Sequence, residues 1–136
     1  MNQQQNTEMA LRILLVEDEA IISMVLKMEL EQAGFQVLQP AECSEKALET
    51  ALENPLDVVI MDIDIQVPRD GIELGQLMEE ERHLPVIFLT GQSNPDRKEK
   101  AEGLANCIGY FVKPVQTESL VGLIRQKLDP SGNGQA

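Results

Sequence analysis

Several polar residues that could do chemistry follow short apolar runs of the chain. They are Glu17, Asp18 and Glu19 after residues 13–16, Asp62 and Asp64 after residues 58–61, Thr90 and Gly91 after residues 86–89, and Lys113 and Pro114 after residues 108–112. Oxygen ligands without histidine or cysteine suit a hard cation such as Mg²⁺. A carboxylate in that setting can attack a phosphoryl group and form an acyl phosphate. A nearby hydroxyl and ammonium group would offset charge on the phosphoryl oxygens.

Each of these positions also has an ordinary structural explanation. Acids that follow a strand often cap the next helix or interact favourably with its dipole. Asp62 and Asp64 lie ahead of a proline and a glycine, where aspartate commonly caps turns. The polar residues after the last two runs suit a tight turn and a solvated loop. The combination, rather than any single position, favours a site.

The elements that must position these residues alternate between short apolar runs and longer amphipathic segments. Strands are expected over residues 11–16, 35–38, 58–61, 86–89 and 108–112, because unbroken apolar runs are typical of strands buried on both faces. Helices are expected over residues 20–33, 44–53, 72–81, 96–105 and 117–128, the second and fifth capped by Ser44 and Thr117. Gly34 is placed to end the first helix.

This (βα)₅ alternation predicts an α/β fold, a single doubly wound parallel sheet with helices on both faces. In such sheets, ligands bind at the carboxyl ends of the strands. The candidate carboxylates, hydroxyl and ammonium group therefore converge on one edge, where several carboxylates repel one another unless a cation intervenes.

Length and composition narrow the possible functions. The chain has 136 residues, which suits one domain, and 23 acidic against 11 basic residues give a net charge of −12. Such an acidic surface repels a phosphate backbone, so nucleic-acid binding by this chain alone is not expected. No GxxxxGK[ST] loop is present to cradle a nucleotide. The single histidine, His83, is expected at the surface before the fourth strand, which leaves little basis for a catalytic triad or a histidine metal site.

The termini and the cysteines predict a cytoplasmic protein without a membrane segment. Residues 1–9 are polar and are expected to form a disordered leader, and residues 129–136 a flexible tail, which could also be the start of a linker. No apolar run approaches the roughly 20 residues of a transmembrane helix. Cys43 and Cys107 lie far apart and are interpreted as small apolar residues in a reducing compartment.

Five motifs, taken together and in order, resemble the response-regulator receiver domains of two-component signalling. They are Ile-Leu-Leu-Val-Glu-Asp-Glu at 13–19, Asp-Val-Val-Ile-Met-Asp at 57–62, Asp-Gly-Ile-Glu-Leu at 70–74, Val-Ile-Phe-Leu-Thr-Gly at 86–91 and Gly-Tyr-Phe-Val-Lys-Pro at 109–114. Each motif alone is weak, but all five at these spacings are a strong signal over residues 10–128. The resemblance implies a flavodoxin-like strand order of 2-1-3-4-5.

The resemblance also implies a phosphoacceptor and a metal site. Asp62 would be the phosphoacceptor and a ligand of Mg²⁺. Asp18 would bind the ion directly and Glu17 through water, while the backbone carbonyl of Asp64 would complete the protein ligands. The phosphoryl donor would be a histidine kinase or a histidine phosphotransfer protein.

A switch and an output surface are implied in the same way. Thr90 would bond the phosphoryl group, Lys113 would pair with it, and Tyr110 would turn inward as Thr90 moves. This change would remodel the face made by the fourth helix, the fifth strand and the fifth helix, where a downstream protein or a second copy of the chain would dock. Five basic residues are assigned to this face: Arg97, Lys98, Lys100, Arg125 and Lys127.

The chain departs from the commonest receiver pattern in its acidic pair and in one loop. The pair is Glu17-Asp18 rather than two aspartates, a variant that the family also uses. The loop from Asp62 to residues 70–71 is one residue longer than usual, so Pro68 follows Asp64 by four residues, which makes Asp64 a second candidate acceptor. Asp62 is preferred because it directly follows four apolar strand residues.

Two other functions remain open alongside a phosphorylatable switch that is not an enzyme. A pseudo-receiver would keep the fold as an interaction module without phosphorylation, although all the site positions are filled. An aspartate-based phosphohydrolase would turn over small phosphate esters, whereas a receiver would stop after modifying itself. Mg²⁺ binding and acyl-phosphate formation separate these alternatives.

Overall fold

Five short strands, rich in valine, isoleucine and leucine, form a parallel sheet in the computed structural model, which describes residues 10–65, 70–92 and 94–128. The strand order is β2-β1-β3-β4-β5, and every neighbouring pair is parallel. The strands are β1 (Arg12–Val16), β2 (Gln36–Val37), β3 (Val58–Asp62), β4 (Val86–Thr90) and β5 (Cys107–Val112). The predicted fold class and strand order are confirmed.

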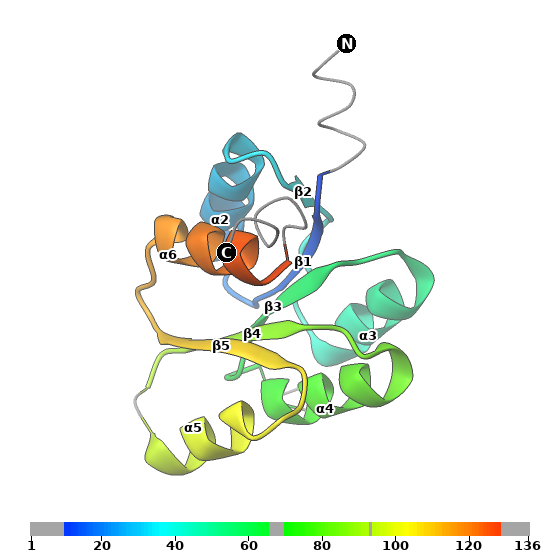
Figure 1. Cartoon of the computed structure of the whole chain (residues 1–136), viewed down its shortest axis with the longest axis vertical. Helices are drawn as coiled ribbons and strands as arrows, with labels where there is room; N and C mark the ends of the chain where they lie inside the picture. Colours follow the sequence, from blue (N-terminus) through cyan, green and yellow to red (C-terminus); the bar gives the residue numbers. More distant parts are fainter. Residues whose placement is uncertain (1–9, 66–69, 93, 129–136) are drawn as a thin grey trace.

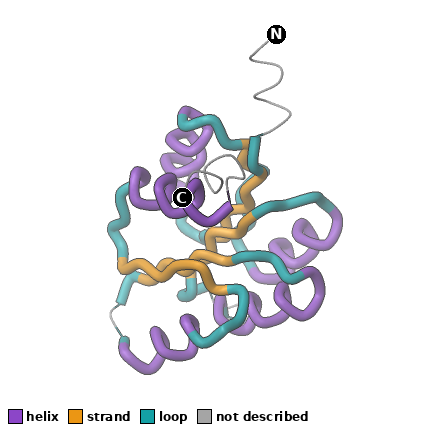
Figure 2. Tube along the Cα trace, viewed as in Figure 1, coloured by secondary structure: helices purple, strands orange, loops and turns teal. Residues whose placement is uncertain are grey.

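Helices cover both faces of this sheet, as Figures 1 and 2 show. The helices are α2 (Ala20–Gln32), α3 (Ser44–Glu53), α4 (Gly71–Arg82), α5 (Pro95–Glu102) and α6 (Thr117–Leu128). On one face, α2 and α6 lie side by side, and on the other face lie α3, α4 and α5 (Figure 1). Right-handed crossovers between parallel strands require this helical cover.

The core is divided by the sheet into two layers, because successive side chains of a strand point to opposite faces. Leu14, Val59 and Phe88 pack under α3, α4 and α5, whereas Ile13 and Ile60 pack under α2 and α6. The inner strands β3 and β4 are buried along their whole length. Such rigid strands hold the residues at their ends in place.

Some predicted helix boundaries are wrong by a few residues. Cys43, with an extended backbone, occupies the N-cap of α3, so Ser44 is the first helical residue instead of the cap. Thr117 is likewise the first residue of α6, and its hydroxyl group donates to the Glu29 carboxylate on α2 rather than capping its own helix. Helix α5 begins one residue before the predicted helix 96–105, with Asn94 as its N-cap and Pro95 as its first residue, and it ends three residues earlier, with Gly103 as its C-cap.

Helix α2 leaves much of its apolar surface exposed. Only Leu26 and Leu30 of its apolar residues are buried, while four others face solvent at 42–77% exposure. These exposed residues are Ile21, Met24, Val25 and Met28. Their spacing of three and four residues places them on one face of the helix, here called the α2 stripe.

No helix in the described ranges is long and apolar enough to cross a bilayer. The expected leader at 1–9 and tail at 129–136 lie outside the described residues. A cytoplasmic location stays a prediction.

Candidate functional site

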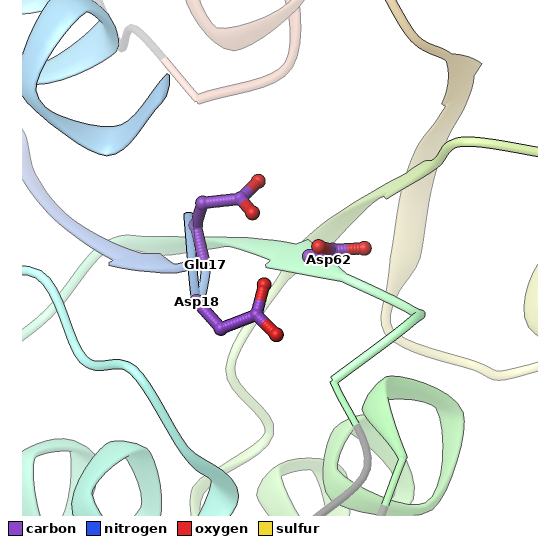
Figure 3. A group of neighbouring side chains, drawn as sticks. All are labelled: Glu17, Asp18 and Asp62. Carbon is purple, nitrogen blue, oxygen red and sulfur yellow. The ribbon is translucent and has the colours of Figure 1, made fainter. Parts of the chain in front are cut away.

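Three carboxylates meet at the carboxyl edge of the sheet, where Figure 3 shows them turned toward one another. The register that pairs Val16 of β1 with Met61 of β3 brings Glu17 and Asp62, the next residues, side by side. One carboxylate oxygen from each of Glu17, Asp18 and Asp62 lies within 4.8 Å of the others. Glu17 and Asp62 are buried and Asp18 is exposed, so a ligand can reach the group from solvent.

Lys113, which directly follows the edge strand β5, extends into this acidic group. The backbone N–H of Lys113 donates to the carbonyl oxygen of Thr90 at 2.7 Å, which fixes the start of the β5–α6 loop beside β4. Its ammonium group then lies 2.8 Å from the Glu17 carboxylate and 3.0 Å from the Asp62 carboxylate. The peptide bond between Lys113 and Pro114 is cis.

Burial and this ion pairing change the proton affinities of the site. Burial raises the pKa of Glu17 to about 7, and the Asp62 charge adds to the rise, although the Lys113 hydrogen bond opposes it. Burial also disfavours the charged form of Lys113, but its hydrogen bonds to Glu17 and Asp62 outweigh that effect and raise the pKa of the ammonium group. Lys113 therefore stays charged between the two carboxylates.

The two candidate acceptors, Asp62 and Asp64, point in different directions. Asp62 is 3% exposed, accepts a hydrogen bond from the backbone N–H of Asp64 at 2.9 Å, and belongs to the acidic group. The Asp64 side chain is 32% exposed and instead accepts hydrogen bonds from the Gly91 N–H and the Thr90 hydroxyl group. Of the two, only Asp62 pairs with Lys113 and belongs to the group with Glu17 and Asp18.

A close approach of α4 keeps the residues after β3 in place. A Cβ atom on Gly71 would lie 2.5 Å from the Asp62 carbonyl oxygen and 2.7 Å from the Ile63 Cα, so a larger residue there would displace one of these segments. The Gly71 N–H donates to the Ile63 carbonyl oxygen at 3.0 Å. Asp70 and Glu73 form a capping box that begins α4 at this point.

The predicted switch residues lie on neighbouring strands. Thr90 is the last residue of β4 and is buried, and Tyr110 lies on β5 opposite Phe88. The hydroxyl group of Tyr110 is already buried, with no hydrogen-bond partner within the described ranges. The ring packs against the core layer under α3, α4 and α5.

Two basic residues assigned to the output face point elsewhere. Arg97 of α5 reaches the functional edge, where its guanidinium group donates to Asp64 at 3.0 Å and to the Ile63 carbonyl oxygen at 3.3 Å. Arg125 of α6 donates to the Ala33 carbonyl oxygen at the end of α2 and lies over the ring of Phe35. The prediction that both belong to the face of α5, β5 and α6 is wrong.

The role of Arg97 at this edge had no signal in the sequence. It lies 33 residues from Asp64, and its neighbours in the chain are ordinary residues of a polar helix. Helix α5 packs against β5, and from there the Arg97 side chain reaches Ile63 and Asp64 after β3.

Comparison with known proteins agrees with this geometry. Residues 13–125 match the model of the response regulator receiver domain. The chain belongs to the receiver-domain family. It is 35% identical to the transcriptional regulatory protein PdtaR of Mycobacterium tuberculosis over 114 residues, which are 83% of this chain and 54% of that protein. It is 39% identical to the transcriptional regulatory protein YrkP of Bacillus subtilis, over 82% of this chain and 47% of that protein.

A solved receiver has the same arrangement of strands and helices. The CheY-like receiver domain protein from Methanospirillum hungatei superimposes with a TM-score of 0.82 at 25% identity, over 93% of this chain and 99% of that one. The chain spans about half the length of the curated relatives it matches. It is a signalling domain of a response regulator.

Proposed function

We propose that this receiver domain takes a phosphoryl group onto Asp62 and passes the signal on through its surface. The observation that carries the proposal is the ion pair between Lys113 and Asp62 inside the group of three carboxylates. An Asp62 carboxylate oxygen would attack the phosphorus of a phosphohistidine, forming a phosphorus–oxygen bond as the phosphorus–nitrogen bond breaks. The donor imidazole leaves with the electron pair of the broken bond.

The acidic group fits a magnesium ion. Its ligands are oxygens only, and two buried carboxylates beside an exposed one supply more negative charge than Lys113 alone offsets. Asp18, Asp62, Glu17 through water, and the Asp64 carbonyl group would hold the ion. When bound, Mg²⁺ would neutralise charge on the phosphoryl oxygens and bring them to Asp62.

Two residues of the chain would hold the phosphoryl group after transfer. Lys113 already touches the attacking carboxylate and would pair with a phosphoryl oxygen as the charge there increases. Thr90, at the end of the neighbouring strand, offers a hydroxyl donor. Its displacement would disturb the packing around Tyr110, which lies one strand away.

The phosphodonor would approach over the α2 stripe. Ile21 and Val25 line a groove of about 500 Å³ whose other wall includes Lys113 and Pro114, beside the acceptor edge. Exposed apolar side chains on one helix face mark protein-binding surfaces. A histidine kinase or phosphotransfer protein that reaches Asp62 must cover this region.

A downstream protein or a second copy of the chain would dock on the face of α5, β5 and α6. The edge strand β5, which carries Tyr110, is only half-buried, so a docking partner can reach it. Lys98, Lys100 and Lys127 are the basic residues that would face a docking partner here. The isolated domain is not proposed to bind duplex DNA.

Phosphate labelling of three proteins tests the proposal. The parent chain, Asp62→Asn and Asp64→Asn are incubated with Mg²⁺ and phosphoramidate or acetyl phosphate, and the modified peptide is mapped by mass spectrometry. The parent and Asp64→Asn should carry a label that hydroxylamine removes, and Asp62→Asn should carry none while it remains folded. Label that persists in Asp62→Asn and disappears in Asp64→Asn would make Asp64 the acceptor.

The alternatives give different results. A parent chain that binds Mg²⁺ but takes no label from any phosphodonor would be a pseudo-receiver. Continuous turnover of a small phosphate ester would identify a phosphohydrolase.

A further inference from the structure

The Asp64 carboxylate is held by donors from two other segments of the chain. It accepts hydrogen bonds from the Gly91 N–H at 2.9 Å and the Thr90 hydroxyl group at 3.3 Å, both at the end of β4. On its other side, the Arg97 guanidinium group donates to it at 3.0 Å. A second Arg97 nitrogen donates to the carbonyl oxygen of Ile63 at 3.3 Å, so the arginine also contacts the backbone of the residue before Asp64.

Through these contacts the Asp64 carboxylate occupies hydrogen-bond donors, the Thr90 hydroxyl group and the Gly91 N–H, that a phosphoryl group on Asp62 would need. The Asp64 N–H donates to the Asp62 carboxylate, so the two acidic side chains flank one short stretch of backbone. A phosphoryl group brings about 1.5 to 2 negative charges and three acceptor oxygens. The Thr90 hydroxyl group has a single proton, and the Gln92 carbonyl oxygen at 3.2 Å is a second acceptor for it, so it cannot donate to either of these acceptors and to a phosphoryl oxygen at once.

We propose that Asp64 and Arg97 form a latch that occupies the donors of Thr90 and Gly91 in the resting protein and opposes phosphorylation of Asp62. The latch rests on the proposed function of Asp62. A phosphoryl group must displace the Asp64 carboxylate to reach the Thr90 hydroxyl group. Arg97 acts through Asp64 and is a positioning residue, because it holds the carboxylate in place.

The latch also connects the acceptor to α5. Arg97 lies in the first turn of that helix, and its N–H donates to the side chain of the N-cap residue Asn94 at 3.1 Å. Displacement of Asp64 would free the Arg97 guanidinium group next to this cap. Phosphorylation of Asp62 would thus change the contacts of the first turn of α5.

An ordinary surface ion pair is the competing explanation. Both side chains are about one-third exposed, and ion pairs in such positions contribute little to stability. An ordinary pair would affect the melting temperature of the resting protein and leave its response to a phosphoryl analogue unchanged. A latch would change that response.

The test is a titration of the full chain with beryllium fluoride, a phosphoryl analogue, at saturating Mg²⁺. The chain has one tyrosine and no tryptophan, so intrinsic fluorescence reports on Tyr110. Asp64→Ala should lower the half-saturating concentration about three- to tenfold, the scale of the net contribution of one ordinary competing hydrogen bond. Glu102→Ala, which breaks the pair with Lys98 on the same helix, removes the same charge away from the site and should shift the midpoint less than about twofold.

A second pair of variants tests the role of Arg97. Arg97→Ala should lower the midpoint in the parent chain and leave it unchanged in the Asp64→Ala background. An equal shift in both backgrounds would show that Arg97 acts on the analogue directly, and an Asp64→Ala midpoint equal to or above that of the parent would overturn the latch.

Failure of the latch and failure of the proposed function are distinguishable with Asp62→Asn. If the parent responds saturably, Asp62→Asn does not, and Asp64→Ala titrates like the parent, only the latch is wrong. If the parent and Asp62→Asn are equally unresponsive, the proposed function is wrong and the latch falls with it.

Discussion

The Lys113 ammonium group lies 3.0 Å from the Asp62 carboxylate, although the two residues are 51 positions apart in the chain. Two strands of the sheet, β3 and β5, and the strand between them set this distance. Because Lys113 also lies 2.8 Å from Glu17, one cation bridges the two buried carboxylates of the site. The Lys113 charge thus holds the unphosphorylated site together, and a phosphoryl group on Asp62 would need the same charge as its partner.

Removal of this cation should destabilise the metal-free protein. Lys113→Met leaves Glu17 and Asp62 buried against each other, and breaking a buried pair costs about 3–5 kcal/mol when one charge remains uncompensated. Urea unfolding in the presence of a chelator should show a loss of this order at pH 8. The matched variant Lys98→Met, which breaks an exposed pair on α5, should cost less than about 1 kcal/mol. A Lys113→Met protein as stable as the parent would mean that the carboxylates are not ionised together.

Magnesium should stabilise the fold by taking over part of this charge compensation. A ligand that binds only the native state adds about 2.7 kcal/mol at 100 times its Kd. The melting temperature should therefore rise at millimolar Mg²⁺, and Asp18→Asn should reduce the rise sharply. Asp57→Asn provides a control outside the acidic group, and its melting temperature should rise with Mg²⁺ as the parent's does. An unchanged melting temperature in the parent would contradict a magnesium site in the acidic group.

Stability should also depend on pH through Glu17. Burial raises the pKa of its carboxyl group from 4.5 to about 7, so between these values the folded protein binds the proton more tightly than the unfolded chain. This group therefore contributes stability that is present below about pH 4.5 and is lost as the pH rises through about 7.

The difference between the parent and Glu17→Gln isolates this effect. In metal-free buffer, the free energy of unfolding of the parent relative to the variant should fall by on the order of 1–3 kcal/mol between pH 5 and pH 8. Denaturant unfolding at a series of pH values measures this difference. A difference that is flat with pH, or that increases with it, would contradict a raised pKa for Glu17.

The sequence predicts the sheet better than it predicts the helix surfaces. The apolar runs at residues 58–61 and 86–89 are typical of strands buried on both faces, which predicts a parallel sheet with Glu17, Asp62 and Lys113 at one edge, while the strand order is implied by the resemblance to receiver domains. The fold class needed no contact information.

The helix faces and the Arg97 contact could not be predicted because they depend on distant packing. The apolar residues of α2 fit an amphipathic pattern, yet Ile21 and Met24 face solvent, since only the side of Leu26 and Leu30 meets the sheet. Arg97 has no local feature that separates it from its neighbours on α5. Its partner is fixed by how α5 packs against β5, which brings the Arg97 side chain within reach of Asp64.

Removal of the buried hydroxyl group of Tyr110 should not destabilise the resting protein. Within the described residues this group is buried with no hydrogen-bond partner, and an unsatisfied buried group costs about 1–3 kcal/mol of desolvation. Tyr110→Phe keeps the ring that packs against the core and removes the uncompensated oxygen. The free energy of unfolding should therefore stay the same or rise by up to about 1 kcal/mol. Phe111→Ala, a truncation on the same strand that removes apolar packing, should lower it and provides the comparison in the same urea titrations. A clear loss of stability in Tyr110→Phe would mean that the hydroxyl group does have a partner in solution, and that Tyr110 is held inward by a hydrogen bond rather than by packing alone.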